Sequence, residues 1–250
     1  MTIKYDGEEL NQIVSTLKTM HKSVVCAGTV KTMDMHQGHL VEVSNLDGTP
    51  VFGINDRHYR IDLREFPKLE KGEYSIDLIE EGSDSFLYIS NNNHDLFYNI
   101  PLIFSRWEEY DPYPLPEIDC NKLKEDSTVS ISIQAKDLQN AVASLDALKD
   151  TPDYIVFKTW DSSKVMLSTS SNPLKQRKKV VISKTIGEFT GIEYVRAVYP
   201  FNKFKKMVES MEGTVNIYLD CDSSMLCQWS AKNHRCSSIL APIVVEEARV

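Results

Sequence analysis

The sequence is poor in several features that define whole classes of protein. Its 250 residues include only 10 glycines and 5 cysteines, and no two cysteines form a Cys-x-x-Cys pair. Reduced thiols are therefore expected in place of a disulfide framework. Glycine-rich phosphate loops and the Gly-x-Ser-x-Gly and His-Glu-x-x-His motifs are also missing from the sequence. We therefore expect a protein that is not an enzyme and that needs no cofactor.

One group of residues could still bind a metal ion. Cys227, His234 and Cys236 lie close together in the sequence, but they lack the close pair and the fourth ligand of a zinc site. Small buried hydrophobic residues are the favoured interpretation of the two cysteines, so no metal is expected.

Long apolar runs and positive charge are scarce as well. No apolar run of about eighteen residues exists, and Met1 to Asp6 lacks the basic and apolar stretches of a signal peptide. We expect an intracellular protein. The 28 Lys and Arg residues against 36 Asp and Glu give a net charge of -8. That charge argues against a protein that coats nucleic acid over its whole surface, but it leaves room for a local basic face.

The second half of the sequence repeats the first. At the start of each half Ile3, Leu10 and Val14 match Ile131, Leu138 and Val142 at one constant offset. Near the end of each half Ser90, Asn93 and His94 match Ser230, Asn233 and His234 at a longer offset, so the second copy carries about twelve extra residues. The repeat predicts two similar domains.

Alternating apolar residues dominate both halves and predict strands. Four segments break this pattern with helical spacing: Glu8 to Met20, Asp62 to Leu69, Lys136 to Leu148 and Asn202 to Met211. Pro67 limits the second of them to a turn or two. The sequence therefore predicts an α+β fold with two helical segments in each half.

A proline-rich stretch separates the halves. Arg106 to Glu117 holds three prolines within five positions, which forbids a helix and disfavours a central strand. We expect one domain over residues 1–104, an extended connector over 105–126, and a second domain with an acidic tail over 127–250.

At this point the sequence resembles the sliding clamp family of proliferating cell nuclear antigen (PCNA). Thr32-Met33-Asp34 with the strand after it is similar to the family's Met-Asp turn. Leu115-Pro116-Glu117 resembles the end of its interdomain connector, and Ile239-Leu240-Ala241-Pro242 resembles its closing strand. The resemblance spans nearly the whole chain, from Ile3 to Glu247.

The resemblance implies a DNA-clamp fold and a function. Clamps of this family form a ring of six similar domains, usually three two-domain subunits, with sheets outside and helices inside around duplex DNA. The expected role is that of a DNA polymerase processivity factor, a homotrimer that holds polymerase and other clients on DNA and is placed there by a clamp loader. The localisation would be nuclear in a eukaryote and cytoplasmic in an archaeon or virus.

A sliding ring needs lysines that contact phosphates without reading bases. The expected DNA-facing residues are Lys18, Lys22, Lys68, Lys203 and Lys206. A solvated helix face is the alternative for each of them. Asn140 and Ala143 stand where the family often carries Arg, so the inner surface is expected to be weakly basic. The basic run Lys175 to Lys179 is interpreted as a solvated turn, with contact to DNA or a partner as the alternative.

The family's peptide-binding groove maps onto three segments of the chain. By resemblance it consists of Met33, Gly38, Leu40, Leu115, Pro116, Ile239, Ala241 and Pro242. An apolar groove of this kind suits a short client peptide with hydrophobic and aromatic side chains. Ordinary domain core is the alternative, above all for Met33 and Ile239. Subunit contacts are expected at strand edges, and by resemblance one edge lies near Ser75 to Leu78 and the other near Ser171 to Val181.

Two other functions remain open from the sequence. The chain could be one subunit of a heterotrimeric clamp, such as a checkpoint clamp or an archaeal clamp with unequal subunits. It could also be a β-rich adaptor that binds peptides and never touches DNA.

Overall fold

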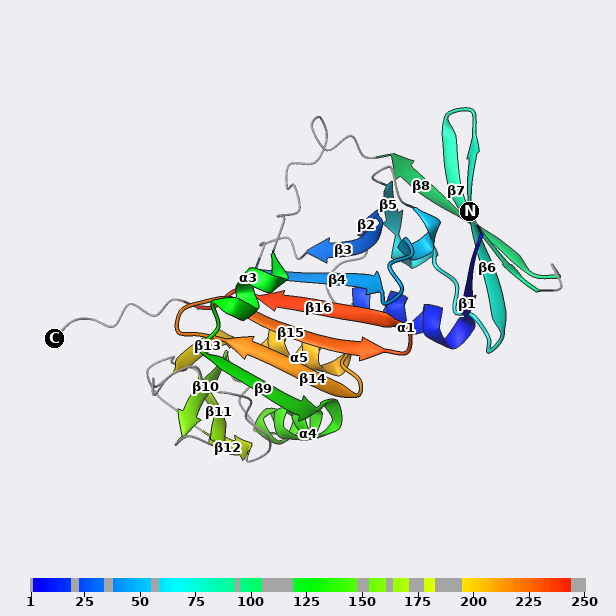
Figure 1. Ribbon diagram of the computed structural model, residues 1–250. Coiled ribbons are helices and arrows are strands. Elements are labelled where there is room, and N and C mark those ends of the chain that lie inside the picture. The colour runs from blue at the N-terminus through cyan, green and yellow to red at the C-terminus, as the bar shows by residue number, and fades with distance from the viewer. Residues whose placement is uncertain are drawn as a thin grey trace. The chain divides into compact units, whose positions relative to one another are not determined.

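The computed structural model describes residues 2–18, 23–33, 38–54, 59–92, 95–104, 119–147, 153–160, 164–170, 178–182 and 195–243. The chain divides into two compact units, which are described separately (Figure 1). The first unit consists of Met1–Glu117 and Ala231–Cys236, and the second of Ile118–Ser230 and Ser237–Val250. The first unit thus includes a short segment from near the end of the chain.

The first unit is built from antiparallel strands with one long helix. Its strands follow the hydrogen-bonded order β1-β6-β7-β8-β5-β2-β3-β4. The elements are β1 (Ile3–Asp6), α1 (Gly7–Lys18), β2 (Ser23–Ala27), β3 (Thr29–Met33), β4 (His39–Asn45), the 3-10 turn η1 (Val51–Gly53), β5 (Tyr59–Asp62), the 3-10 turn η2 (Leu63–Glu65), β6 (Glu73–Glu81), β7 (Asp84–Asn91) and β8 (Phe97–Phe104).

The second unit follows a similar course, with three helices among its described residues where the first unit has one. Its strands follow the orders β16-β15-β14-β9 and β12-β11-β10-β13. The elements are α3 (Cys120–Glu125), β9 (Val129–Gln134), α4 (Ala135–Asp146), β10 (Tyr154–Trp160), β11 (Lys164–Ser170), β12 (Lys178–Ile182), β13 (Arg196–Pro200), α5 (Phe201–Glu209), β14 (Thr214–Leu219), β15 (Met225–Ala231) and β16 (His234–Leu240).

The strand register confirms the internal duplication. In the first unit β1 pairs antiparallel with β6, with Ile3 opposite Ile76. In the second unit β9 pairs antiparallel with β14, with Ile131 opposite Ile217. In each unit the first strand therefore leads into a helix and pairs with the sixth strand. The prediction of an α+β fold with two similar halves is confirmed.

The helices agree with the sequence in all but two places. α1, α4 and α5 lie within two residues of the predicted segments. The segment over Asp62 to Leu69 contains only the single turn η2, which Asp62 caps by accepting the Arg64 N–H. Helix α3 lies in the range expected to be extended connector. None of the helices in the described part of the chain is long and apolar enough to cross a bilayer.

Aromatic residues fill the core of the second unit beneath α5. Phe157 of β10 meets the Phe204 ring of α5 edge-on, with ring centroids 5.3 Å apart. It also meets the Tyr199 ring of β13 edge-on at 5.9 Å. All three side chains are fully buried. Because buried aromatic residues contribute much apolar area, these contacts hold α5 on its sheet.

The observed strand pairing can be compared with the two expected strand edges. β6 is hydrogen-bonded to β7 over Tyr74–Glu81 but to β1 only over Glu73–Ile76, so the described strands cover Ser75 and Ile76 on both sides and pair Asp77 and Leu78 on the β7 side alone. β12 ends the order β12-β11-β10-β13 among the described strands, as expected for the other edge. Lys178 and Lys179 belong to this strand and not to a turn.

Candidate nucleic-acid interface and peptide groove

Helix α1 presents a polar face opposite its buried stripe. It begins where the Asp6 carboxylate accepts the Glu8 N–H at 2.8 Å. Leu10, Ile13, Val14 and Leu17 are buried, whereas Glu8, Ser15 and Lys18 are exposed. Lys18 therefore lies on the solvent side of the last turn, where a cation also suits the helix dipole.

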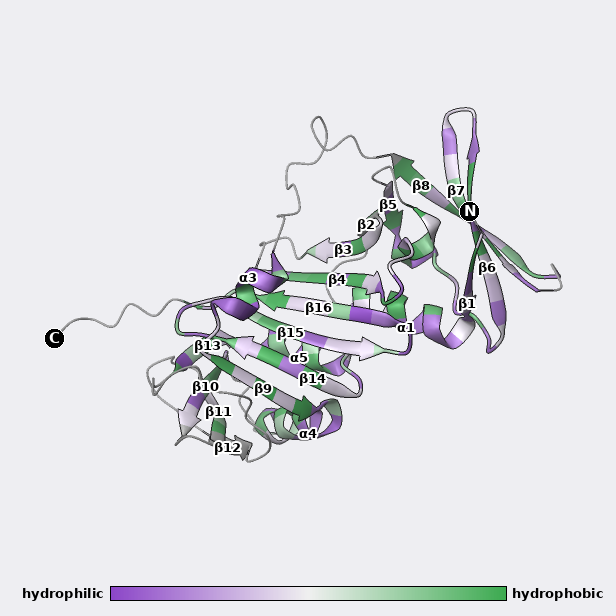
Figure 2. Ribbon diagram, in the orientation of Figure 1, coloured by the Kyte–Doolittle hydropathy of each residue, from purple (hydrophilic) through white to green (hydrophobic). Residues whose placement is uncertain are grey.

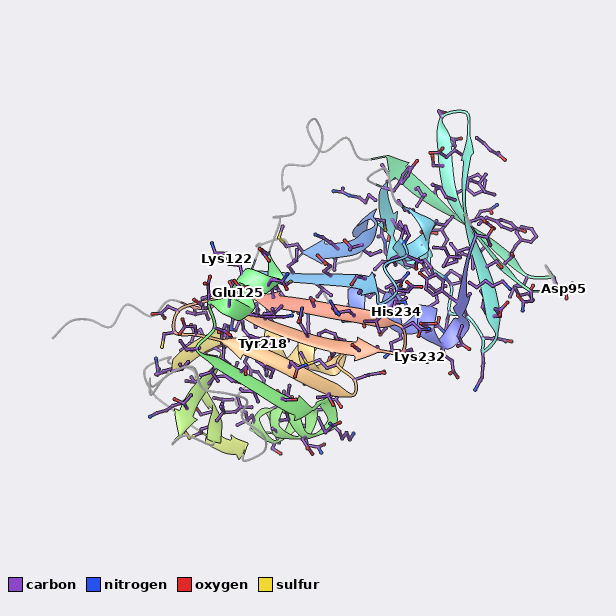
Figure 3. All side chains as sticks on the ribbon, viewed as in Figure 1. Asp95, Lys122, Glu125, Tyr218, Lys232 and His234 are labelled. Atoms are coloured by element: carbon purple, nitrogen blue, oxygen red, sulfur yellow. The ribbon has the colours of Figure 1, made fainter. Side chains whose placement is uncertain are left out.

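The start of α1 lies beside two lysines that the sequence did not single out. Lys71 Nζ lies 3.9 Å from a Glu8 carboxylate oxygen, and Lys232 Nζ lies 3.7 Å from the other. Lys232, which is labelled in Figure 3, also lies 3.7 Å from Asp6. These exposed pairs contribute little stability, but they offset the acidic charge at this end of the helix.

Helices α4 and α5 of the second unit contact each other through polar side chains. Gln139 of α4 donates to the carbonyl oxygens of Val208 and Met211 at 3.2 and 3.1 Å. Lys205 of α5 donates to Asp146 of α4 at 2.7 Å. This bond raises the pKa of Lys205 and keeps its charge paired.

Lys206 is therefore the most accessible lysine of α5. Its side chain is exposed, whereas Lys203 is half-buried. The exposed face of α4 carries Asn140 and Ala143. Together α4 and α5 contain four lysines and three carboxylates. The two helices thus carry only a slight positive charge, so any contact with phosphates would be weak.

Of the two remaining lysines that were expected to face DNA, the structure describes one. Lys68 is exposed, but it follows η2 in an irregular segment and does not lie on a second helix as expected. Pro67 directly precedes it, and proline disfavours helical backbone in the residue before it. Lys22 lies outside the described residues.

The first wall of the expected peptide groove lies in a hairpin of the first unit. Met33 of β3 is directly opposite Leu40 of β4, so the two side chains project from the same face. Met33 is half-buried and Leu40 is buried, and Gly38 before β4 is half-buried.

The other described groove residues lie at the end of the second unit. Ile239 is buried within β16, whereas Ala241 and Pro242 are half-buried beyond it. The Ile243 N–H donates to the Val198 carbonyl at 2.8 Å, which fixes the chain after the strand. Leu115 and Pro116 lie outside the described residues, so the connector side of the groove stays a prediction.

A buried ionisable pair in the first unit was missed from the sequence. His234 Nδ1 lies 3.0 Å from a Glu9 carboxylate oxygen (Figure 3), and both side chains are buried. The Tyr5 ring stacks on His234 with centroids 5.8 Å apart. Burial lowers the pKa of His234, while the carboxylates of Glu9 and Asp47 act in the opposite direction. The repeat at His94 and His234 was the only sequence signal here.

Short helix α3 was missed for a different reason. Asp119 caps it by accepting the N–H groups of Asn121 and Lys122. The Lys124 ammonium lies 5.7 Å from the centre of the Tyr218 ring of β14, within cation-π range. The helix buries none of its residues, so it has no apolar stripe that a sequence pattern could reveal.

Along the described chain the second unit follows the course βαβββ twice, and the first unit follows it once before a second run in which η2 takes the place of the helix. Comparison with solved structures agrees over nearly the whole chain. PCNA from Entamoeba histolytica matches with a TM-score of 0.73 and 17% identity, over 97% of this chain and 98% of that one. PCNA from Thermococcus kodakaraensis matches with a TM-score of 0.72 and 15% identity, over 97% and 99%.

A further match is the PCNA of the complex described as the C-terminal region of FEN-1 bound to A. fulgidus PCNA. Its TM-score is 0.72 with 16% identity, and 98% of this chain and 99% of that one are covered. The chain matches no protein-family model and no curated protein sequence. The protein has the PCNA-like sliding clamp fold, at an identity low enough that the fold alone follows from these likenesses.

Proposed function

We propose that this protein is a sliding clamp that encircles duplex DNA and holds replication and repair proteins on it. The observation that carries the proposal is the agreement with PCNA structures over 97% or more of both chains. A clamp works by shape and by client binding, so the proposal assigns no chemical step to the protein.

Phosphate contacts would come from Lys18, Lys68, Lys203 and Lys206, with Lys22 as an expected fifth. Lys206 is the best single test because it is exposed on α5 while its neighbour Lys205 is paired with Asp146. Each phosphate that a lysine neutralises contributes about 0.9 to the slope of log affinity against log salt. A ring of three chains carries each of these lysines three times, so the affinity of the ring for DNA would fall steeply with salt if all of them contact phosphates.

The test is retention on nicked circular plasmid after loading by a clamp loader. Wild-type protein should remain on the closed circle and leave after the plasmid is linearised, because a ring slides off a free end. Lys206→Glu should shorten retention, whereas Lys122→Glu on α3, which also reverses one exposed lysine, should not. Equal retention on circular and linear DNA would refute the proposal that the protein encircles DNA.

The proposed assembly is a homotrimer. A solution mass three times 28.5 kDa would support it. The second candidate is a subunit of a heterotrimer, which one of the similar structures favours because it is a complex of PCNA2 and PCNA3 from Sulfolobus tokodaii, with a TM-score of 0.72 and 11% identity. A constant mass of one chain at all concentrations would favour this candidate.

The proposed client site is the groove of Met33, Gly38, Leu40, Leu115, Pro116, Ile239, Ala241 and Pro242. Its support is the PCNA structure that is described as bound to a FEN-1 segment. Fluorescence anisotropy with a synthetic peptide carrying one aliphatic and two aromatic residues tests it. Ala241→Asp should abolish binding, whereas Ala143→Asp on the exposed face of α4 should not. Equal binding by both variants would exclude this groove.

A further inference from the structure

Helix α4 ends on an acidic residue that its own stability does not favour. Asp146 is the last residue of α4, and none of the residues in the last turn of this helix is basic. The C-terminus of a helix carries the negative end of its dipole, where a carboxylate is unfavourable and a cation is stabilising. Asp146 therefore weakens α4 unless a positive charge from another element lies beside it.

Helix α5 supplies that positive charge. Lys205 Nζ donates to Asp146 Oδ2 at 2.7 Å, and the two side chains are 37% and 32% exposed. Glu209, one turn further along α5, adds a smaller electrostatic attraction to the same ammonium group. Because the pair is partly exposed, water reaches it, and so can a phosphate group.

Lys205 belongs to a group of three lysines on α5. Lys206 is exposed opposite the buried stripe of the helix, and the half-buried Lys203 and Lys205 flank it. A lysine side chain is a charge on a long flexible stem. Without Asp146, the Lys205 ammonium can therefore reach the surface that Lys206 presents. With Asp146, it is held on the side of α5 that faces α4.

Other contacts hold the two helices together. Gln139 of α4 donates to the carbonyl oxygens of Val208 and Met211 at the end of α5. Figure 2 shows hydrophobic as well as hydrophilic residues along α4, and its Leu138 and Leu145 are fully buried. Loss of the ion pair would therefore release the Lys205 side chain without displacing either helix.

Asp146 and a DNA phosphate would compete for the same ammonium group. An ion pair at a wet surface and a lysine–phosphate contact are of similar strength, because water and salt screen both of them. If Lys205 moved from Asp146 to a phosphate, it would exchange one contact for the other and leave a carboxylate that repels the phosphate. The exchange would add almost nothing to the affinity for DNA.

We propose that Asp146 withholds Lys205 from DNA, so that Lys205 does not add to the phosphate contacts proposed for Lys203 and Lys206. This inference rests on the proposed function, because it takes α4 and α5 to face the duplex. It gives a reason for the carboxylate at the end of α4. A clamp that slides has to break its phosphate contacts at every step, and Asp146 limits their number.

Equilibrium binding of a short fluorescent duplex to the full-length protein at several NaCl concentrations tests this proposal. The central variant is Asp146→Asn, which keeps the shape of the side chain, removes its charge and relieves the end of α4. Asp137→Asn is the matched control, because it removes one exposed carboxylate from the first turn of the same helix. Lys205→Met, alone and combined with Asp146→Asn, shows whether a gain in affinity depends on Lys205.

Asp146→Asn should bind the duplex at least about threefold more tightly at low salt. The slope of log affinity against log salt should steepen by about 0.9 for each lysine that gains a phosphate. Lys205→Met alone should stay within about twofold of wild type, because its ammonium contributes little while Asp146 holds it. The gain from Asp146→Asn should shrink in the double variant to the small change that Asp137→Asn gives.

The proposal is overturned if Asp146→Asn binds no more tightly than Asp137→Asn, or if the full gain persists without Lys205. It is also overturned if Lys205→Met weakens binding as much as Lys206→Met, since Lys205 would then contact phosphate in the wild type. Failure of the proposed function gives a different result. Wild-type protein would then be retained equally on circular and linear plasmid, whatever the duplex affinities of these variants.

Discussion

Stability of the first unit is expected to fall as the pH drops through the ordinary range of histidine, because His234 is buried next to Glu9. Burial lowers the pKa of His234 below its usual 6.5. The unfolded chain therefore binds this proton more readily than the folded chain, and stability rises with pH. The stability that depends on keeping His234 neutral is fully present well above pH 6.5 and is lost progressively as the pH falls below that value.

The magnitude follows from linkage. One proton bound only by the unfolded chain changes the free energy of unfolding by at most about 1.4 kcal/mol per pH unit. Between about pH 7 and about pH 5.5 the loss is then at most about 1.3 kcal/mol. With a urea dependence of about 2–3 kcal/mol per molar, the unfolding midpoint moves down by about 0.4–0.6 M.

Urea unfolding followed by circular dichroism at several pH values measures this loss. His234→Gln removes the titrating group, so the difference between wild type and variant should shrink as the pH falls. Asp6, Asp47 and Glu73 do not interfere, because their hydrogen bonds lower their pKa values from 3.8, 3.8 and 4.5. A difference that is independent of pH, or one that grows as the pH falls, would refute the reasoning. A difference that grows would mean that the attraction between Glu9 and a protonated His234 outweighs the effect of burial on the pKa of His234.

Three further substitutions have expected outcomes in the same unfolding assay. Gly7→Ala should destabilise the protein by about 1–3 kcal/mol, because a Cβ there would lie 2.0 Å from the Glu70 carbonyl oxygen. An unchanged unfolding midpoint would mean that the backbone moves to make room for the Cβ without a loss of stability. Phe204→Ala should cost about 3–5 kcal/mol because the ring is fully buried. A double-mutant cycle of Lys205→Met and Asp146→Asn should give a coupling energy below about 1 kcal/mol, because both side chains are half-buried and water still screens the pair. A larger coupling energy would refute this.

The fold was predictable where local patterns and the internal repeat coincide. Two local patterns predicted elements that the structure confirms. The alternation of Ile131 and Ile133 predicted a strand, and the apolar stripe of Phe204, Met207 and Val208 predicted a helix. Because the repeat relates distant segments, it also predicted that each half begins with a strand and a helix. Helix α3 escaped because its stability comes from a cap and a contact with Tyr218.

The candidate site was less accessible to sequence reasoning. A helical spacing shows which lysines can share a face, but the pairing of Lys205 with Asp146 depends on how α5 packs against α4. For the same reason the Glu9–His234 pair was not foreseen, since its members lie at opposite ends of the sequence. The position of Lys68 was set by Pro67, which was read correctly as a limit on the helix. The prediction, made by resemblance, that Lys68 lies on a second helix was nevertheless wrong.

The inclusion of Ala231–Cys236 in the first unit has a consequence for biosynthesis. A ribosome releases the residues of β1 and α1 first, yet the segment that covers Tyr5 and Glu9 emerges only after the second repeat has been made as far as β15. Until then the amino-terminal half exposes an incomplete core, a condition that favours slow, non-local folding and exposes the nascent chain to aggregation. We therefore expect the amino-terminal half expressed alone to lack part of its core.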